Sequence, residues 1–217
     1  MRAKKHIKQG EELTIFYTDF LESRHSIRSK ILNEWKFLCQ CQRCTDNTEF
    51  GSNFSSFKCN CGGYFYEERE KMWKCSQCKE ENNLTNDYKV ADDLWDVIPT
   101  QKIDFDALNT IMTKKKYHKQ FYVSIKLYQV FIEQHQSATD RDTIENVIDK
   151  TDIVLTTMSQ LEGGCSRLAA KYLTIRSNCQ GKLLKLKHAN KEISEKELKT
   201  AIGQIMKCKV LVAKIKG

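Results

Sequence analysis

The cysteines are the residues of this sequence whose type and spacing most directly indicate chemistry. Seven of the ten lie within residues 39–78, and chance is a poor explanation for such clustering. Zinc in proteins takes four nitrogen or sulfur ligands in a tetrahedron, and closely spaced pairs of cysteines can supply them. The second cysteine group contains two such pairs and therefore predicts a closed zinc site, formed by Cys59, Cys61, Cys75 and Cys78.

Two glycines, Gly62 and Gly63, directly follow the first pair of this group. Glycine adopts tight turns at little steric cost, and such a turn can aim backbone N–H groups at thiolates. We therefore expect the Gly62–Gly63 turn to form part of the zinc site.

The first cysteine group has three members, Cys39, Cys41 and Cys44, within six residues. They are close enough to bind one zinc ion but are one ligand short of a tetrahedron. His25, His6 or a water molecule could supply the fourth ligand, although neither histidine stands at a typical motif spacing. The other three cysteines of the chain are isolated in sequence that reads as helical.

The cellular compartment bears on what clustered thiols do. None of the apolar runs approaches the ~20 residues that a membrane span needs. The start, MRAKKHIKQG, is basic but lacks the apolar core of a signal peptide. We therefore expect a nuclear or cytoplasmic protein without a membrane association, in which clustered cysteines bind metal rather than form disulfides.

The elements that would position these cysteines begin with the stretch GEELTIFY, residues 10–17. Its apolar residues alternate, which predicts a strand after a turn. Residues 23–36 predict a helix with Ser23 as its N-terminal cap and with Ile27, Ile31, Leu32 and Trp35 on one apolar face. Residues 37–85 are rich in glycine, asparagine and serine, and we expect this segment to have little core of its own.

From about residue 87 onward, apolar residues recur at helical spacing. The stretch 117–135 is apolar on more than one side, which predicts a helix buried on several faces. The last two long helices should form an antiparallel hairpin, and Ser194 with Glu197 fits a capping box at the start of the final one. The sequence therefore predicts a mainly α protein: a small β and zinc-binding part, then an array of antiparallel helices like that of tetratricopeptide proteins. It shows no clear 34-residue repeat.

The net charge of +8 is unevenly spread. Residues 143–217 hold 14 Lys and Arg against 7 Asp and Glu. A solvated helical face explains this better than a surface for nucleic acid or an acidic partner, because the basic residues are not interleaved with aromatic ones. Direct nucleic-acid binding is therefore the least favoured function.

Three motifs in this order resemble a SET-domain protein of the SMYD type, especially its arthropod-type members. GEELTIFY is similar to the closing motif of the SET domain, and CQCQRC, residues 39–44, is similar to the post-SET cysteine knot. The stretch LEGGCSRLAAKYL…KEISEKELKTAI resembles the C-terminal helical domain of these proteins. The resemblance implies three parts: residues 1–20 as the end of a SET domain, residues 21–85 as a post-SET zinc region, and residues 86–217 as a helical domain.

Proteins of this family transfer a methyl group from S-adenosylmethionine to a protein lysine. The resemblance implies that Tyr17 is the active-site tyrosine, whose hydroxyl orients the methyl group and the lysine amine. Trp35 falls where relatives often have a tyrosine that lines the lysine channel, so a hydroxyl is lost there. Phe37 matches the aromatic residue that packs on the adenine of the cofactor. Without the family, ordinary packing against the cysteine knot would explain Trp35 and Phe37.

Several family segments are not found in these 217 residues: the glycine-rich cofactor segment, the Asn-His-Ser-Cys segment and the inserted MYND zinc finger. The cysteine of Asn-His-Ser-Cys is the usual fourth ligand of the post-SET zinc. We therefore expect that this chain alone does not bind S-adenosylmethionine usefully and is inactive, whereas a full-length form could be active. The second cysteine group resembles an extra zinc-binding pair of the arthropod-type members, with Cys-x-Cys in place of the more usual Cys-x-x-Cys.

Two other functions stay open. The first is a non-enzymatic module that binds a partner protein through the helical array and is held together by zinc. The second is a basic, chromatin-associated protein that binds nucleic acid.

Overall fold

The computed structural model describes residues 7–11, 15–69, 71–100, 102, 104–115, 117–162 and 166–216. The fold is mainly α-helical with one small antiparallel sheet, as the sequence predicts. The described chain divides into two compact units, residues 7–127 and residues 128–217. Among the described helices, none combines the length and the apolar character needed to cross a membrane.

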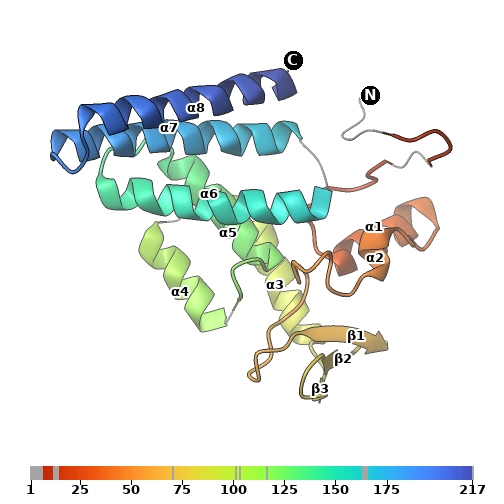
Figure 1. The fold of residues 1–217 in the computed structure, drawn as a ribbon. Helices are drawn as coiled ribbons and strands as arrows, with labels where there is room; N and C mark the ends of the chain where they lie inside the picture. The colour runs from red at the N-terminus through yellow and green to blue at the C-terminus, as the bar shows by residue number, and fades with distance from the viewer. Residues whose placement is uncertain are drawn as a thin grey trace. The chain divides into compact units, whose positions relative to one another are not determined.

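The first unit begins with irregular chain and then forms helices, with a small sheet at one side of them (Figure 1). Its elements are α1 (Arg24–Trp35), α2 (Gln42–Thr45), β1 (Phe65–Arg69), β2 (Met72–Cys75), β3 (Glu81–Asn82), α3 (Thr85–Val97), the 3₁₀ turn η1 (Ile98–Thr100), α4 (Phe105–Lys115) and the start of α5 (Tyr122–His135).

The strand predicted over residues 10–17 is wrong for the residues that the structure describes. Residues 15–17 form no strand, and Leu13 and Thr14 lie outside the described part. A strand needs a partner for its backbone N–H and C=O groups, and the described sheet pairs only β1, β2 and β3. Ile15, Phe16 and Tyr17 are therefore left on the surface, with 55%, 54% and 43% of their areas exposed.

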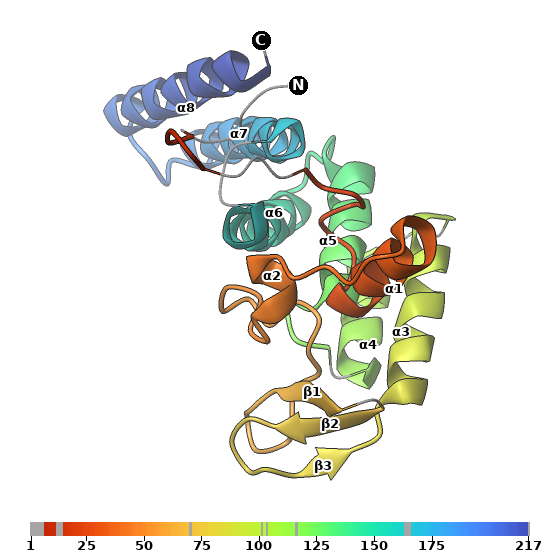
Figure 2. The same ribbon diagram turned by 90° about the vertical axis from the view of Figure 1, so that its right-hand side faces the viewer.

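The three-stranded sheet corrects the expectation that residues 37–85 have little core of their own. β1 lies beside β2 (Figure 2) and pairs with it in antiparallel fashion. Phe65 lies opposite Cys75 in this pairing. Strand residues two apart share a face, and these strands bury Phe65, Trp73 and Cys75 there. They form one apolar cluster with Cys59, Leu84 and Tyr88. The sheet is therefore built directly onto the second cysteine group.

Helix α1 confirms the predicted cap. The Ser23 hydroxyl accepts a hydrogen bond from the backbone N–H of Ser26 at 3.2 Å, which satisfies one of the free donors of the first turn. Ile27 and Ile31 are buried against Cys44. The rest of the predicted apolar face, Leu32 and Trp35, is exposed.

The second unit contains the end of α5 and the long helices α6 (Arg141–Glu162), α7 (Arg167–Ala189) and α8 (Glu195–Lys216). Figures 1 and 2 both show α6, α7 and α8 as successive neighbours, and α7 packs on each of the other two. The antiparallel hairpin of α7 and α8 is thus confirmed. The core is made by aliphatic side chains of α6 and α7, including Val147, Val154, Met158, Ala170 and Ile175.

Two further helix predictions are also confirmed. At the start of α8, the backbone N–H of Ser194 donates to Glu197 Oε2 at 2.8 Å, and the N–H of Glu197 donates to Ser194 Oγ at 3.3 Å. This is the predicted capping box. The helix predicted over residues 117–135 begins at Tyr122 and is buried on several sides, since Val123, Ile125, Leu127, Phe131 and Ile132 are all at most 1% exposed.

Candidate metal centres and an exposed aromatic cluster

The second cysteine group has the geometry of a closed metal site. The four sulfur atoms, from Cys59, Cys61, Cys75 and Cys78, lie within 4.8 Å of one another. The Sγ atoms of Cys61 and Cys75 are 3.4 Å apart, and those of Cys59 and Cys78 are 3.7 Å apart. Tetrahedral zinc with Zn–S bonds of about 2.3 Å requires sulfur atoms about 3.8 Å apart. The donor set therefore fits a structural zinc ion.

Backbone N–H groups face these thiols, as the glycine turn predicts. The N–H of Gly63 donates to Cys61 Sγ at 3.5 Å, and the N–H of Gln77 donates to Cys75 Sγ at 3.4 Å. The bond from Gly63 stabilises the thiolate and, with the neighbouring Cys75 thiol, lowers the pKa of Cys61 to about 6. Metal binding requires thiolates, so these N–H groups prepare the site for a cation.

The turn also requires glycine at position 63 for reasons of space. A Cβ atom built on Gly63 would lie 2.8 Å from Cys75 Sγ and 3.0 Å from Gln77 Cγ. Gly62 has a φ of +97°, a conformation that favours glycine. The two glycines thus let the Cys59–Cys61 segment approach the Cys75–Cys78 segment closely.

The first cysteine group is also brought together. Cys39, Cys41 and Cys44 have their sulfur atoms within 4.8 Å of one another, and they could hold a metal ion with three ligands. Burial beside the other two thiols raises the pKa of Cys44 to about 12. A cation at this position would offset the unfavourable burial of charged thiolates, because it favours the thiolate forms of all three cysteines.

The candidates for the fourth ligand are not found in this group. Among the described residues, the group within 4.8 Å consists of the three thiols alone. The ring of His25 instead lies 6.4 Å from the ring of Tyr88. His6 lies outside the described residues.

The structure brings together the three aromatic residues that the resemblance singles out. The ring of Tyr17 meets Trp35 edge-on at a centroid distance of 5.2 Å and meets Phe37 in the same manner at 5.3 Å. All three side chains are partly exposed, at 43%, 55% and 39%. We call these three residues the aromatic cluster. It lies next to the first cysteine group in the sequence, because Phe37 precedes Cys39 by two residues.

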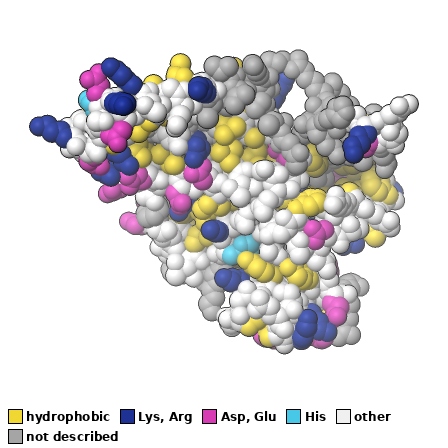
Figure 3. All heavy atoms as spheres, viewed as in Figure 1, with side chains coloured by type: hydrophobic (Ala, Val, Ile, Leu, Met, Phe, Trp, Pro, Cys, Tyr) yellow, Lys and Arg dark blue, Asp and Glu magenta, His cyan; other side chains and the backbone are white. Residues whose placement is uncertain are grey.

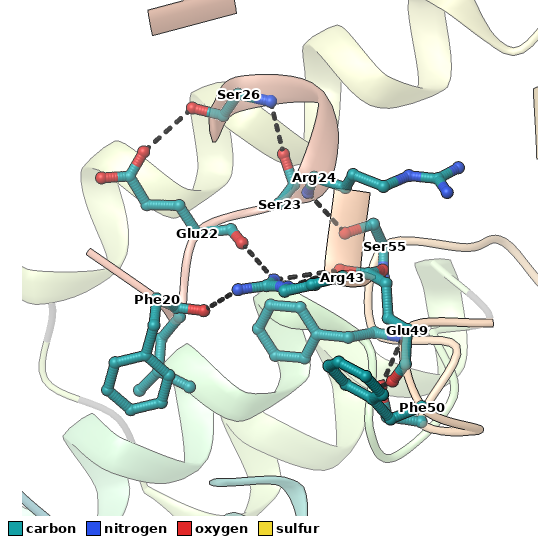
Figure 4. Close-up of polar contacts among 12 residues, drawn as sticks. Phe20, Glu22, Ser23, Arg24, Ser26, Arg43, Glu49, Phe50 and Ser55 are labelled. Carbon is teal, nitrogen blue, oxygen red and sulfur yellow. Dashed lines mark hydrogen bonds and ion pairs between the residues drawn. The ribbon is translucent and has the colours of Figure 1, made fainter. Parts of the chain in front are cut away.

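A buried ion pair that sequence patterns do not predict joins the first cysteine group to the segment that follows it. Arg43, within the first group, donates to Glu49 Oε1 through Nε at 3.0 Å and through an Nη atom at 2.9 Å. Both side chains are buried, at 8% and 0% exposed. Figure 4 shows the guanidinium group of Arg43 reaching back to the backbone carbonyls of Phe20 and Glu22.

Glu49 is satisfied on its other side as well. Its second oxygen accepts the backbone N–H of Ser55 at 2.7 Å. The Ser55 hydroxyl in turn accepts the N–H of Arg24, the first residue of α1, at 2.7 Å (Figure 4). The only signal in the sequence is a charged residue inside a cysteine motif and an acid six residues later, which indicates nothing without the fold.

Comparison with known proteins gives one informative likeness. No protein-family model matches the sequence. A protein of Acanthamoeba polyphaga mimivirus, named Putative SET domain-containing protein L678, is 31% identical to the chain over 68 residues. The match covers 31% of this chain and 21% of the viral protein, so the chain spans about a fifth of the length of that relative. The molecule is thus a mainly α-helical protein with two cysteine groups that could hold metal, and 68 of its residues are similar to part of a SET domain-containing protein.

Proposed function

We propose that the chain is the C-terminal portion of a protein-lysine N-methyltransferase of the SMYD type. The observation that carries this proposal is the meeting of Tyr17, Trp35 and Phe37 beside a three-cysteine knot. The likeness to the mimivirus protein supports a SET origin for part of the chain. The proposed compartment is the nucleus, the cytoplasm or both.

The aromatic cluster would serve the transfer of a methyl group to a lysine amine. S-adenosylmethionine supplies the methyl group on a positively charged sulfur. The hydroxyl of Tyr17 would orient the arriving amine, since correct alignment of two reactants is a large part of such catalysis. Trp35 would line the lysine channel as an apolar wall, and Phe37 offers an exposed ring suited to packing on adenine.

The two cysteine groups would hold zinc as structural ions. The four thiols of the second group form a complete ligand set by themselves. The three thiols of the first group would need one more ligand, which the family takes from its Asn-His-Ser-Cys segment. Both ions would stabilise the segments around the aromatic cluster rather than take part in the reaction.

Calorimetry with S-adenosylmethionine tests this proposal. We expect no binding at micromolar concentrations by the 217-residue chain. We expect binding and methyl transfer to lysine by any longer product of the same gene that carries a glycine-rich cofactor segment and Asn-His-Ser-Cys. Replacement of Tyr17 by Phe should abolish that transfer while the zinc content stays unchanged. A longer product with both segments that neither binds the cofactor nor methylates protein would contradict the proposal.

A second candidate function is the binding of an acidic peptide by α7 and α8. Residues 167–216 hold 13 Lys and Arg against 3 Asp and Glu. A groove of about 340 Å³ runs between the two helices, with Leu183, Leu184 and Ile205 among its lining residues. Ile202 and Met206 of α8 are 37% and 56% exposed. Figure 3 shows Lys and Arg side chains over the α7–α8 end at its upper left, with some Asp and Glu among them and hydrophobic side chains exposed between them.

The chemistry of this surface favours a peptide over a nucleic acid. Proteins that bind single strands offer exposed aromatic rings for stacking. Tyr172 is the one aromatic residue of α7 and α8 in the sequence, and it is buried. An amphipathic acidic helix would place apolar side chains in the groove and carboxylates near the lysines.

Fluorescence anisotropy would test this candidate with a short labelled peptide that carries Glu and Leu at helical spacing. We expect binding that weakens with salt and is lost when Leu184 and Ile205 are both replaced by Asp. A matched peptide with Lys in place of Glu should not bind. Absence of binding by the acidic peptide, or equal binding of single-stranded DNA, would rule this candidate out.

A further inference from the structure

Arg43 is placed where it can link the first cysteine group to the aromatic cluster. It lies between Cys41 and Cys44 on α2, a helix of one turn. The backbone N–H of Thr45 donates to the carbonyl of Cys41 at 3.1 Å, so the turn is held in shape. A metal ion on the three thiols would fix both ends of this turn and therefore the direction of the Arg43 side chain.

The other end of Arg43 holds the segment that carries Tyr17. Its Nη atoms donate to the carbonyls of Phe20 and Glu22, the latter at 2.9 Å. These carbonyls stand three and five residues after Tyr17. No strand holds residues 15–17, so this segment is placed by its ring contacts, by the burial of Phe20 and Leu21 and by these hydrogen bonds from Arg43.

Burial makes these contacts specific to arginine. The guanidinium group lies 5.4 Å from the ring of Phe54, which is fully buried. It makes four hydrogen bonds to three partners: Phe20, Glu22 and Glu49. Arginine has five donors in a planar fork, whereas lysine offers one point charge with three donors. A lysine could keep the charge opposite Glu49 but could not reach all three partners with that geometry.

We propose that Arg43 is a positioning residue that couples metal binding at Cys39, Cys41 and Cys44 to the placement of Tyr17 against Trp35. The catalytic meaning of this coupling rests on the proposed methyltransferase function, whereas the coupling itself does not. It passes from the thiols through the α2 turn to Arg43, and from Arg43 through two carbonyls to the Tyr17 segment. The direct chain from Phe37 to Cys39 gives Phe37 a separate link to the same metal.

The test compares the zinc-loaded chain with its Arg43→Lys variant by NMR and hydrogen exchange. The indole N–H resonance of Trp35, assigned with Trp35→Phe, reports the contact with the Tyr17 ring. In Arg43→Lys we expect unchanged zinc content and an unchanged exchange rate in α1. We expect exchange in residues 19–23 to rise at least about tenfold. The Trp35 resonance should move to its position in Tyr17→Ala.

The matched control is Arg28→Lys. Arg28 is a half-buried arginine of α1 outside the Arg43 network, so the same substitution there should leave all three readouts unchanged. The proposal would be overturned if Arg43→Lys binds zinc while its amide exchange and its Trp35 resonance stay unchanged. If Arg43→Lys fails to fold, Cys39→Ser takes its place as the test variant. Loss of metal in Cys39→Ser should produce the faster exchange and the shifted Trp35 resonance. The absence of both changes would equally overturn the proposal.

Failure of the coupling and failure of the proposed function give different results. If the Trp35 and exchange changes occur but no longer product of the gene transfers methyl groups, the coupling stands and the proposed function fails. If a longer product is active and Arg43→Lys changes neither its rate nor the Trp35 resonance, the coupling alone fails.

Discussion

The hydrogen bonds of His118 fix the protonation state of its ring. Its Nε2 atom lies 3.2 Å from the carbonyl oxygen of Asn53 and 3.0 Å from that of Ser56. Both carbonyls can only accept, so Nε2 carries the proton. Nδ1 accepts the backbone N–H of Gln120 at 3.3 Å. The ring is therefore neutral and ties residues 53–56 to the start of α5.

Burial lowers the pKa of His118 from 6.5 to about 4. Between these two values the unfolded chain holds a proton at this position and the folded chain does not. The free energy of unfolding therefore falls as the pH falls through this window, by up to about 1.4 kcal/mol per pH unit. Above the window this contribution to the pH dependence vanishes.

Urea unfolding of the zinc-loaded chain at about pH 7 and about pH 5 measures this effect against His118→Gln. Glutamine can still donate to one carbonyl but does not titrate. We expect the original chain to lose more stability than the variant between the two pH values. Acid effects on the cysteine groups are common to both proteins and cancel. Equal losses in the two proteins would show that His118 does not titrate with a lowered pKa.

At the residue scale, the sequence predicts those side chains whose chemistry depends on local spacing. The seven cysteines of the two groups are of this kind, and both groups come together as expected. Arg43, Glu49 and His118 are of another kind, because their partners lie across loops whose path only the fold determines. The roles of Tyr17, Trp35 and Phe37 stay predictions, although their mutual contact is observed.

At the scale of the elements, the Gly62–Gly63 turn decides whether the two halves of the second cysteine group can meet. The Gly63 position is crowded by Cys75 and Gln77. Gly63→Ala should force these segments apart and weaken zinc binding, because a Cβ contact of 2.8 Å is too short for any side chain to occupy unchanged. The rate of zinc release to a colorimetric chelator measures the effect.

Gly181→Ala provides the matched control for this prediction. A Cβ atom on Gly181, within α7, meets nothing within 4 Å. The same substitution there should raise the free energy of unfolding by about 0.5–1 kcal/mol, since alanine is the better helix former. Gly63→Ala with an unchanged rate of zinc release would show that the turn adapts without cost to the metal site.

The elements differ in how well the sequence predicts them, for a physical reason. The long helices have apolar faces that repeat over many residues and caps set by local side chains, so α6, α7 and α8 follow from the pattern. The strand over residues 10–17 does not form among the described residues because a strand is stable only with a partner. The sequence pattern does not predict the three short strands, because β3 has two residues and β1 contains an irregularity between Glu67 and Arg69.

At the scale of the whole molecule, the two compact units have different sources of stability. The unit of residues 128–217 has a continuous aliphatic core, in which Val147, Val154 and Ala170 are fully buried. The unit of residues 7–127 combines smaller apolar clusters with the two cysteine groups, and Cys44, Cys59 and Cys75 are themselves core members. This unit also buries Ile98, Phe121 and Ile125, but the two small clusters around its cysteines depend on metal, because their thiols are core members.

Removal of metal should therefore unfold one unit and spare the other. All three tryptophans, Trp35, Trp73 and Trp95, lie in the unit of residues 7–127, so their fluorescence reports on that unit alone. With a strong chelator we expect their emission to shift to the red, because Trp73 leaves its cluster with Cys59 and Cys75. Amide exchange in α6 and α7 should stay slow, since their core contains none of the seven clustered cysteines. Re-addition of zinc should restore the emission.

Two outcomes would contradict this prediction. A chelator that leaves the tryptophan emission unchanged would show that apolar packing alone holds the first unit together. Equal unfolding of α6 and α7 would show that the two units depend on one another for stability.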